Sequence, residues 1–141
     1  MLKFHTSSRT RHRATVAATI AVAAVATLVS AAPAAVAADP RTQFGPLRYG
    51  ASYALGYLRW HARSVDVDYS IKAYGCRTLW AFGYDANGNL HYPPAQATVC
   101  DTTDTETMNV PVDVPGGASR VLLQFDDDAG VTRDQETGLH P

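Results

Sequence analysis

Apolar and polar residues alternate along most of the chain after residue 56, a pattern typical of strands that bury one face. The clearest run extends from Val65 to Ala73, where every second residue is apolar and the others are polar or charged. Shorter runs of the same period cover residues 58–63, 107–114 and 121–125. Residues after position 38 show no convincing amphipathic helix, so the pattern predicts an all-β domain.

Turn-forming residues separate these runs. The segment Ala86-Asn87-Gly88-Asn89 contains an Asn-Gly pair, which tolerates positive φ, and it predicts a hairpin before Leu90-His91-Tyr92. We expect Pro93-Pro94 to close that strand, and Pro115-Gly116-Gly117 to form another turn. Pro111 lacks an amide proton, so the strand that contains it is expected at the edge of a sheet.

The strand before the predicted hairpin is apolar on both sides. One side carries the bulkier residues Thr78, Trp80, Phe82 and Tyr84. The other side carries the small or aliphatic residues Leu79, Ala81 and Gly83. We therefore expect this strand in the centre of its sheet, with both faces covered. The large aromatic residues Trp60, Tyr69, Trp80 and Phe82 are assigned to the core.

The runs amount to seven or eight short strands, with turns every eight to twelve residues. This spacing predicts a small antiparallel β-sandwich of the immunoglobulin-like class, and a closed barrel is the alternative. Residues 39–56 form an N-terminal segment with a first strand, residues 57–133 the sandwich core, and the polar residues 134–141 a frayed tail.

The amino terminus has the three parts of a secretory signal peptide. Residues 1–13 hold four basic and no acidic residues, residues 14–29 are uncharged and apolar or small, and residues 30–38 offer small residues for cleavage. A membrane anchor is the alternative, but residues 14–29 are short for a bilayer span of about 20 residues. The chain is predicted to be secreted, to start after cleavage at Ala38 or Asp39, and to have no membrane contact.

Cleavage would change the charge and the redox environment of the remaining 103 or so residues. They hold eight basic and thirteen acidic residues, a net charge of −5, which argues against nucleic acid or anionic lipid as partners. In an oxidising compartment Cys76 and Cys100 are expected to form a disulfide, which would stabilise the fold by about 3–4 kcal/mol. The number of residues that remain suits one domain, and this domain is expected to be a monomer.

The sequence offers little support for catalysis. It has no Gly-x-Ser-x-Gly motif, and His61, His91 and His140 do not have the spacing of metal ligands. We assign no catalytic residue and expect a protein that is not an enzyme, with an enzyme of unrecognised type as an alternative.

Two acidic loops are candidates for calcium, which prefers oxygen ligands. Residues 85–89 are similar to the opening of a calcium loop, but residues 90–97 lack the acidic residue that would complete it. Residues 84–90 also resemble one unit of the Tyr-Asp repeats of large secreted toxins and wall proteins. The second loop holds Asp126, Asp127 and Asp128, the candidate calcium ligands, and a solvated turn is the other interpretation.

Tyrosine is abundant, and exposed tyrosines are common in binding surfaces. The residues not required by the core form a candidate binding patch of Tyr57, Arg59, His61, Tyr74 and Tyr92. They favour a non-catalytic recognition module for an extracellular protein or carbohydrate.

The composition of the chain resembles that of small secreted proteins of actinobacteria. In size, export and tyrosine content it is also similar to the small disulfide-bridged β-sandwich inhibitors of amylase. This resemblance implies an inhibitor of an extracellular hydrolase as an alternative function. An envelope-associated structural protein is a third.

Overall fold

We describe residues 38–141 from a computed structural model of the chain, and the predicted signal peptide falls on residues 1–37, outside the described residues. The described part consists of eight β-strands joined by turns and loops, with no helix. It accordingly holds no helix long and apolar enough to cross a membrane.

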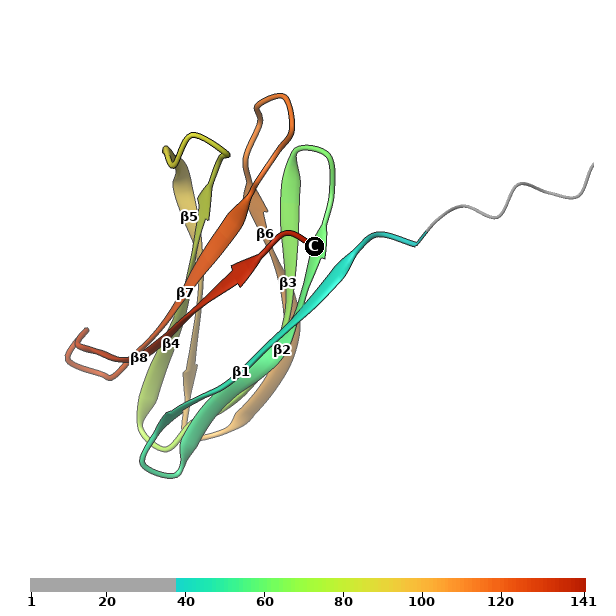
Figure 1. Cartoon of the computed structure of the whole chain (residues 1–141). Helices are drawn as coiled ribbons and strands as arrows, with labels where there is room; N and C mark the ends of the chain where they lie inside the picture. Colours follow the sequence, from blue (N-terminus) through green and yellow to red (C-terminus); the bar gives the residue numbers. More distant parts are fainter. Residues whose placement is uncertain (1–37) are drawn as a thin grey trace, which may run out of the picture. The chain divides into compact units, whose positions relative to one another are not determined.

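The strands form two antiparallel four-stranded sheets that face each other (Figure 1). Sheet A has the order β1 (Arg41–Tyr49), β2 (Ser52–Trp60), β3 (Ser64–Lys72) and β6 (Thr103–Pro111). Sheet B has the order β5 (Leu90–Cys100), β4 (Cys76–Tyr84), β7 (Arg120–Asp126) and β8 (Thr132–Leu139). The predicted all-β fold of two antiparallel sheets is confirmed. Because the strands form two separate sheets, the closed-barrel alternative is wrong.

The core lies between the sheets and follows the alternation in the sequence. On β3 the inward residues are Val65, Val67, Tyr69 and Ile71, all of them buried. Sheet B faces them with buried residues of β4 and β7, namely Leu79, Ala81, Val121, Leu123 and Phe125. Trp60 is also in the core, as predicted, and its indole Nε1 donates to Thr42 Oγ1 over 2.9 Å.

Strand β4 lies between β5 and β7, which confirms its predicted central position. Its inner face, however, is the one with small residues. A Cβ atom on Gly83 would lie 2.9 Å from Cγ1 of Val110 in β6 and 2.5 Å from Cγ2 of Val112 just after it, so these side chains pack directly against the backbone of β4. Trp80 and Phe82 therefore lie half-buried on the outer face. Their assignment to the core was wrong, because the close approach of the sheets requires the small side of β4 inside.

The two ends of the described part are more ordered than the sequence suggests. The N-terminal segment 39–56 holds all of β1 and half of β2, and the predicted frayed tail 134–141 lies largely in β8. The inward residues of β8 include carboxylates that accept hydrogen bonds from β1. Gly45 N donates to Glu136 Oε2 and Arg48 N donates to Asp134 Oδ2, each over 2.8 Å. The tail prediction was wrong because β8 pairs with β7 along its length and also makes these polar contacts, without an apolar face.

The predicted end of a strand at Pro93-Pro94 was also wrong, since β5 continues to Cys100. The two prolines lie where the register between β4 and β5 shifts, opposite Phe82. Strand β5 lies at the edge of sheet B, so one of its sides has no neighbouring strand. At a bulge in such a strand, prolines can lack amide protons without removing a hydrogen bond between strands. Strand β6, which contains Pro111, lies at an edge as predicted.

The predicted disulfide between Cys76 and Cys100 is confirmed. The two residues are direct partners in the β4–β5 ladder, with their Cα atoms 4.0 Å apart. The bond therefore joins neighbouring strands of one sheet, at the end where both strands connect to sheet A. Nearby, Ala73 N donates to Thr102 O over 2.8 Å and Gly75 N donates to Asp101 Oδ1 over 2.6 Å. These hydrogen bonds join the β3–β4 connection to the β5–β6 connection, which both run between the sheets.

Candidate functional site

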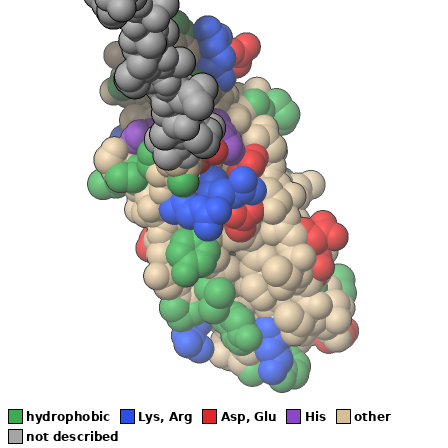
Figure 2. Space-filling view, turned by 90° about the vertical axis from the view of Figure 1, so that its right-hand side faces the viewer, with side chains coloured by type: hydrophobic (Ala, Val, Ile, Leu, Met, Phe, Trp, Pro, Cys, Tyr) green, Lys and Arg blue, Asp and Glu red, His purple; other side chains and the backbone are tan. Residues whose placement is uncertain are grey.

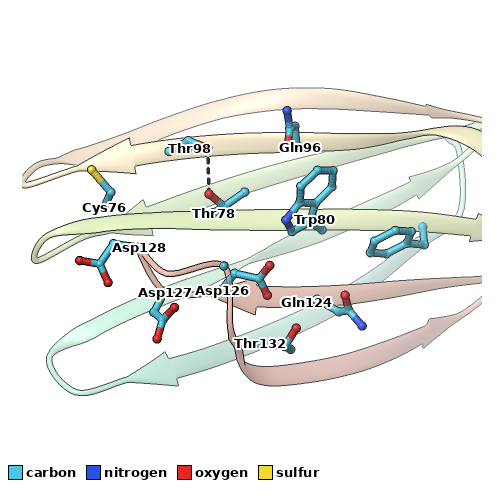
Figure 3. A pocket seen from close by; sticks show the side chains of 12 residues that line it. Cys76, Thr78, Trp80, Gln96, Thr98, Gln124, Asp126, Asp127, Asp128 and Thr132 are labelled. Carbon is cyan, nitrogen blue, oxygen red and sulfur yellow. Dashed lines mark hydrogen bonds between the residues drawn. The ribbon is translucent and has the colours of Figure 1, made fainter.

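A groove of about 590 Å³ runs over the outer face of sheet B (Figure 3). Trp80 and Phe82 of β4 form its apolar floor. Polar residues of the flanking strands line its sides, among them Gln96 of β5 and Gln124 of β7. One end is acidic, where the last residue of β7 and the loop that follows it contribute the carboxylates of residues 126–128.

The register of the sheet sets this arrangement. Trp80 is the direct ladder partner of Gln96 on one side and Gln124 on the other. Side chains of paired residues in a sheet project from the same face, so the indole lies between two amides. The rings of Trp80 and Phe82 have centroids 6.0 Å apart and planes inclined by 20°. Together they make a continuous apolar strip along β4.

The groove combines chemical groups that a polar ligand can use. A half-buried aromatic strip offers apolar area, and each glutamine offers two donors and one acceptor oxygen. The hydroxyls of Thr78 and Thr98 lie 2.9 Å apart and bond to each other. No lysine or arginine lines the groove within the described residues. Its only charges are negative.

Asp127, at the acidic end, is fully engaged by its own loop. Its Oδ1 accepts hydrogen bonds from Ala129 N over 3.0 Å and Val131 N over 2.9 Å, and its Oδ2 accepts one from Arg133 Nε over 2.6 Å. The hydrogen bond from the Val131 amide is the main cause that lowers the pKa of the Asp127 carboxyl, and Arg133 adds to it. This carboxylate holds the loop and is not free for a ligand.

Asp126 is different. The residue is 8% exposed, and within residues 38–141 its buried Oδ1 has no hydrogen-bond partner. It is paired in the ladder with Thr78 and Thr132, which both line the groove. A buried carboxylate without a partner is uncommon in folded proteins.

The structure does not bring the candidate calcium ligands Asp126, Asp127 and Asp128 together. Their carboxylates point away from one another (Figure 3), and the described residues contain no cluster of three or more His, Cys, Asp or Glu side chains suited to a metal ion.

The other acidic loop is a turn of the same construction. Asp85 Oδ1 accepts from Asn87 N over 2.8 Å and from Asn89 N over 2.9 Å, and its Oδ2 lies 3.2 Å from His91 Nε2. The bond from the Asn89 amide is the largest of the causes that lower the pKa of Asp85 far below its usual range. The predicted hairpin between β4 and β5 is confirmed, and the carboxylate that resembled a calcium ligand closes it.

The five residues of the candidate binding patch are dispersed. Tyr57 and Arg59 project from the outer face of β2 in sheet A, and His61 follows them. Tyr74 lies on the connection between β3 and β4, and Tyr92 lies on β5 of sheet B. Tyr57, Tyr74 and Tyr92 are exposed, as a binding role would require, but they do not form one surface.

Arg59 and His61 are engaged by carboxylates. Arg59 donates to both oxygens of Asp68 over 2.6 and 2.9 Å, and this contact raises the pKa of Arg59 and lowers that of Asp68. The two ring nitrogens of His61 each lie 3.0 Å from a carboxylate, of Asp39 and of Asp66. Basic and acidic side chains lie side by side in the view from the sheet A side (Figure 2). A smaller groove of about 340 Å³ lies beside Tyr57 on this face.

Sequence reasoning missed Trp80, Phe82, Gln96, Gln124 and Asp126 as members of one surface. The contrast between the two sides of residues 78–84 could have indicated this surface. The side with small residues is the one that a closely packed second sheet can cover, so the side with Trp80 and Phe82 is left facing outward.

Comparison with known proteins assigns no family. No family model matches the chain, and no match is found among the curated proteins or the solved structures.

Proposed function

We propose that this protein is a secreted, non-catalytic recognition module that binds carbohydrate on the outer face of sheet B. The observation that carries the proposal is the half-buried strip of Trp80 and Phe82, with Gln96 and Gln124 in register on either side of the indole. Sugars present apolar C–H faces and hydroxyl edges, and this surface offers an apolar strip with amides beside it.

The groove is also suited to an extended ligand. It lies on an open sheet face, and its volume of about 590 Å³ is within the range of small-molecule sites. The absence of basic side chains from its lining, within the described residues, makes an acidic polysaccharide a poor ligand.

Two further observations support a binding role outside the cell. The disulfide between Cys76 and Cys100 is consistent with an oxidising compartment, as is the signal-like amino terminus. The carboxyls whose pKa is lowered at the hairpins, those of Asp85 and Asp127, hold their turns. They are not poised for acid–base chemistry.

The proposal rests on the sheet face and not on the finer, immunoglobulin-like interpretation of the sandwich. In immunoglobulin domains the disulfide joins the two sheets, whereas here it joins β4 and β5 within sheet B.

The test is titration calorimetry of protein produced from the full chain with cellohexaose, the hexamer of N-acetylglucosamine and the hexamer of glucosamine. We expect at least one to bind, and Trp80→Ala to weaken that binding by about tenfold or more, since an aromatic contact contributes over 1 kcal/mol. Tyr57→Ala, on the outer face of sheet A, is the matched control and should bind as the wild type does. The proposal would be refuted if none of the three oligosaccharides bound, or if Tyr57→Ala weakened binding and Trp80→Ala did not.

A further inference from the structure

The acidic end of the groove contains a carboxylate that lacks a partner within the described part of the chain. Asp126 is more than nine-tenths buried as a residue, and its buried Oδ1 accepts no hydrogen bond from residues 38–141. Removing a carboxylate from water without compensation is costly, so a buried one is expected to have a donor or a counter-charge. Residues 38–141 supply no such group to Asp126 Oδ1.

Its surroundings do not supply one. Thr78 and Thr132 flank Asp126 in the ladder, but neither donates to it. The nearest arginine along β8, Arg133, is bonded to Asp127. The carboxylate instead borders the groove, on the same strand as Gln124 (Figure 3). Because Oδ1 is buried, a donor in the groove would reach this carboxylate through its other oxygen, Oδ2.

A divalent metal ion does not suit this position. Calcium takes six to eight oxygen ligands, several of them carboxylates. Asp127 is occupied by its loop, and the carboxylate of Asp128 points away from that of Asp126 (Figure 3). A primary ammonium group needs fewer acceptor groups than calcium does, because one carboxylate and one or two neutral acceptors satisfy its three donors.

We propose that Asp126 binds a protonated primary amine of the ligand, so that the ligand is an oligosaccharide of hexosamine units with free amino groups. This inference rests on the proposed function, because the sugar ring would lie against Trp80. Asp126 and Gln124 are two residues apart on one face of β7, about 7 Å by strand geometry, and Gln124 is the ladder partner of Trp80. A ring on the indole would thus place its amine within reach of Asp126.

The chemistry of the lining favours this ligand over related ones. An ammonium group gives Asp126 both a donor and a counter-charge, whereas a hydroxyl gives only a donor and an acetylated amine is neutral. A basic peptide could also supply an ammonium group. The aromatic strip flanked by two glutamines favours a sugar, since a cation alone would not need the amides.

The test is titration calorimetry with protein produced from the full chain, at about pH 6, where ordinary amines are protonated. The ligands are the hexamer of glucosamine, the hexamer of N-acetylglucosamine and cellohexaose, with hexalysine as the peptide. We expect the glucosamine hexamer to bind about tenfold or more tightly than its acetylated form, because charge-assisted hydrogen bonds are the stronger class. The two hexamers differ only by acetylation, so this comparison needs no variant to fold.

The variant Asp126→Asn keeps the size of the side chain and removes its charge. It should bring the two hexamers to within about twofold of each other while binding of the acetylated one is kept. Glu106→Gln removes a charge from an exposed residue of β6 in sheet A, outside this groove, and should keep the preference. Far-UV circular dichroism and the melting temperature show whether each variant is folded.

The outcomes separate the two proposals. If all three sugars bind equally and Trp80→Ala weakens them, recognition of carbohydrate stands and the amine site is overturned. If none binds, both proposals are overturned. Binding of hexalysine as tight as that of the glucosamine hexamer, and insensitive to Trp80→Ala, would show a general cation surface and would overturn the amine site too.

Discussion

Asp85 and Asp127 occupy equivalent positions in the two hairpin loops of sheet B. Each carboxylate accepts hydrogen bonds from the amides two and four residues later, and its second oxygen faces the side chain six residues later. In each loop a glycine at the fourth position has positive φ, Gly88 and Gly130. Sheet B thus uses one loop construction twice, at opposite ends, because β4 and β7 run antiparallel.

This relationship predicts a pH dependence of stability. Both carboxyls have a pKa lowered by folding, so their stabilising effect is fully present above the unfolded pKa of about 3.9 and is lost as the pH falls towards the folded value. The midpoint of urea unfolding should therefore fall steadily below about pH 4. Asp85→Asn should be less stable than the wild type at neutral pH and should show a flatter pH dependence in acid. Equal slopes for the two proteins would contradict the assignment.

The contact between the sheets at Gly83 predicts a steric effect. A Cβ atom there would lie 2.5 Å from Val112 Cγ2 and 2.9 Å from Val110 Cγ1. Gly83→Ala should lower the free energy of unfolding by about 1–3 kcal/mol, the usual cost of overpacking. In the double variant with Val112→Ala the added methyl gains room, so the two effects should be less than additive. Additive losses in denaturant titrations would show that the residues are not in contact.

The carboxylate of Glu136 predicts how the last strand is held. Gly45 N donates to it over 2.8 Å, from β1 in the other sheet. Glu136→Ala should destabilise the protein by about 1–3 kcal/mol, since it removes a hydrogen bond to a charged group. The loss should be local, with faster amide hydrogen exchange in β1 and β8 than in β3. Glu106→Ala, an exposed residue of β6, is the control. Uniformly faster exchange over the whole sandwich would contradict a local role.

Reduction of the disulfide between Cys76 and Cys100 should lower the free energy of unfolding. A loop of about 25 residues corresponds to about 3–4 kcal/mol in the chain-entropy description. The double variant Cys76→Ala with Cys100→Ala should behave as the reduced protein does, and a reductant should not change it further. A reductant effect on that variant would point to another cause.

The alternation of the sequence predicts most of the fold, because most strands bury one face. Strands β3 and β7 were recognisable for that reason, as was the hairpin with Asn87-Gly88. Strand β8 was not, because its inward residues Asp134 and Glu136 bond to backbone amides of β1, and such partners leave no periodic apolar signal.

The candidate surface was harder to predict than the fold. Exposed tyrosines were the guide, yet Tyr57, Tyr74 and Tyr92 are spread over both sheets and a connection. The groove depends on which side of β4 faces inward, and that side is decided by the contact of Gly83 with Val112 from a distant part of the chain. Local periodicity does not indicate which distant segments of the chain lie against each other in the folded protein.

The most direct test of carbohydrate recognition on sheet B is a nitrogen–proton NMR titration with the glucosamine hexamer. The chain has two tryptophans, with Trp60 buried in the core and Trp80 half-exposed in the groove. We predict that the Trp80 indole and the side-chain amides of Gln96 and Gln124 shift on binding while the Trp60 indole does not. Shifts confined to the sheet A side around Tyr57, or none at saturating sugar, would contradict the account.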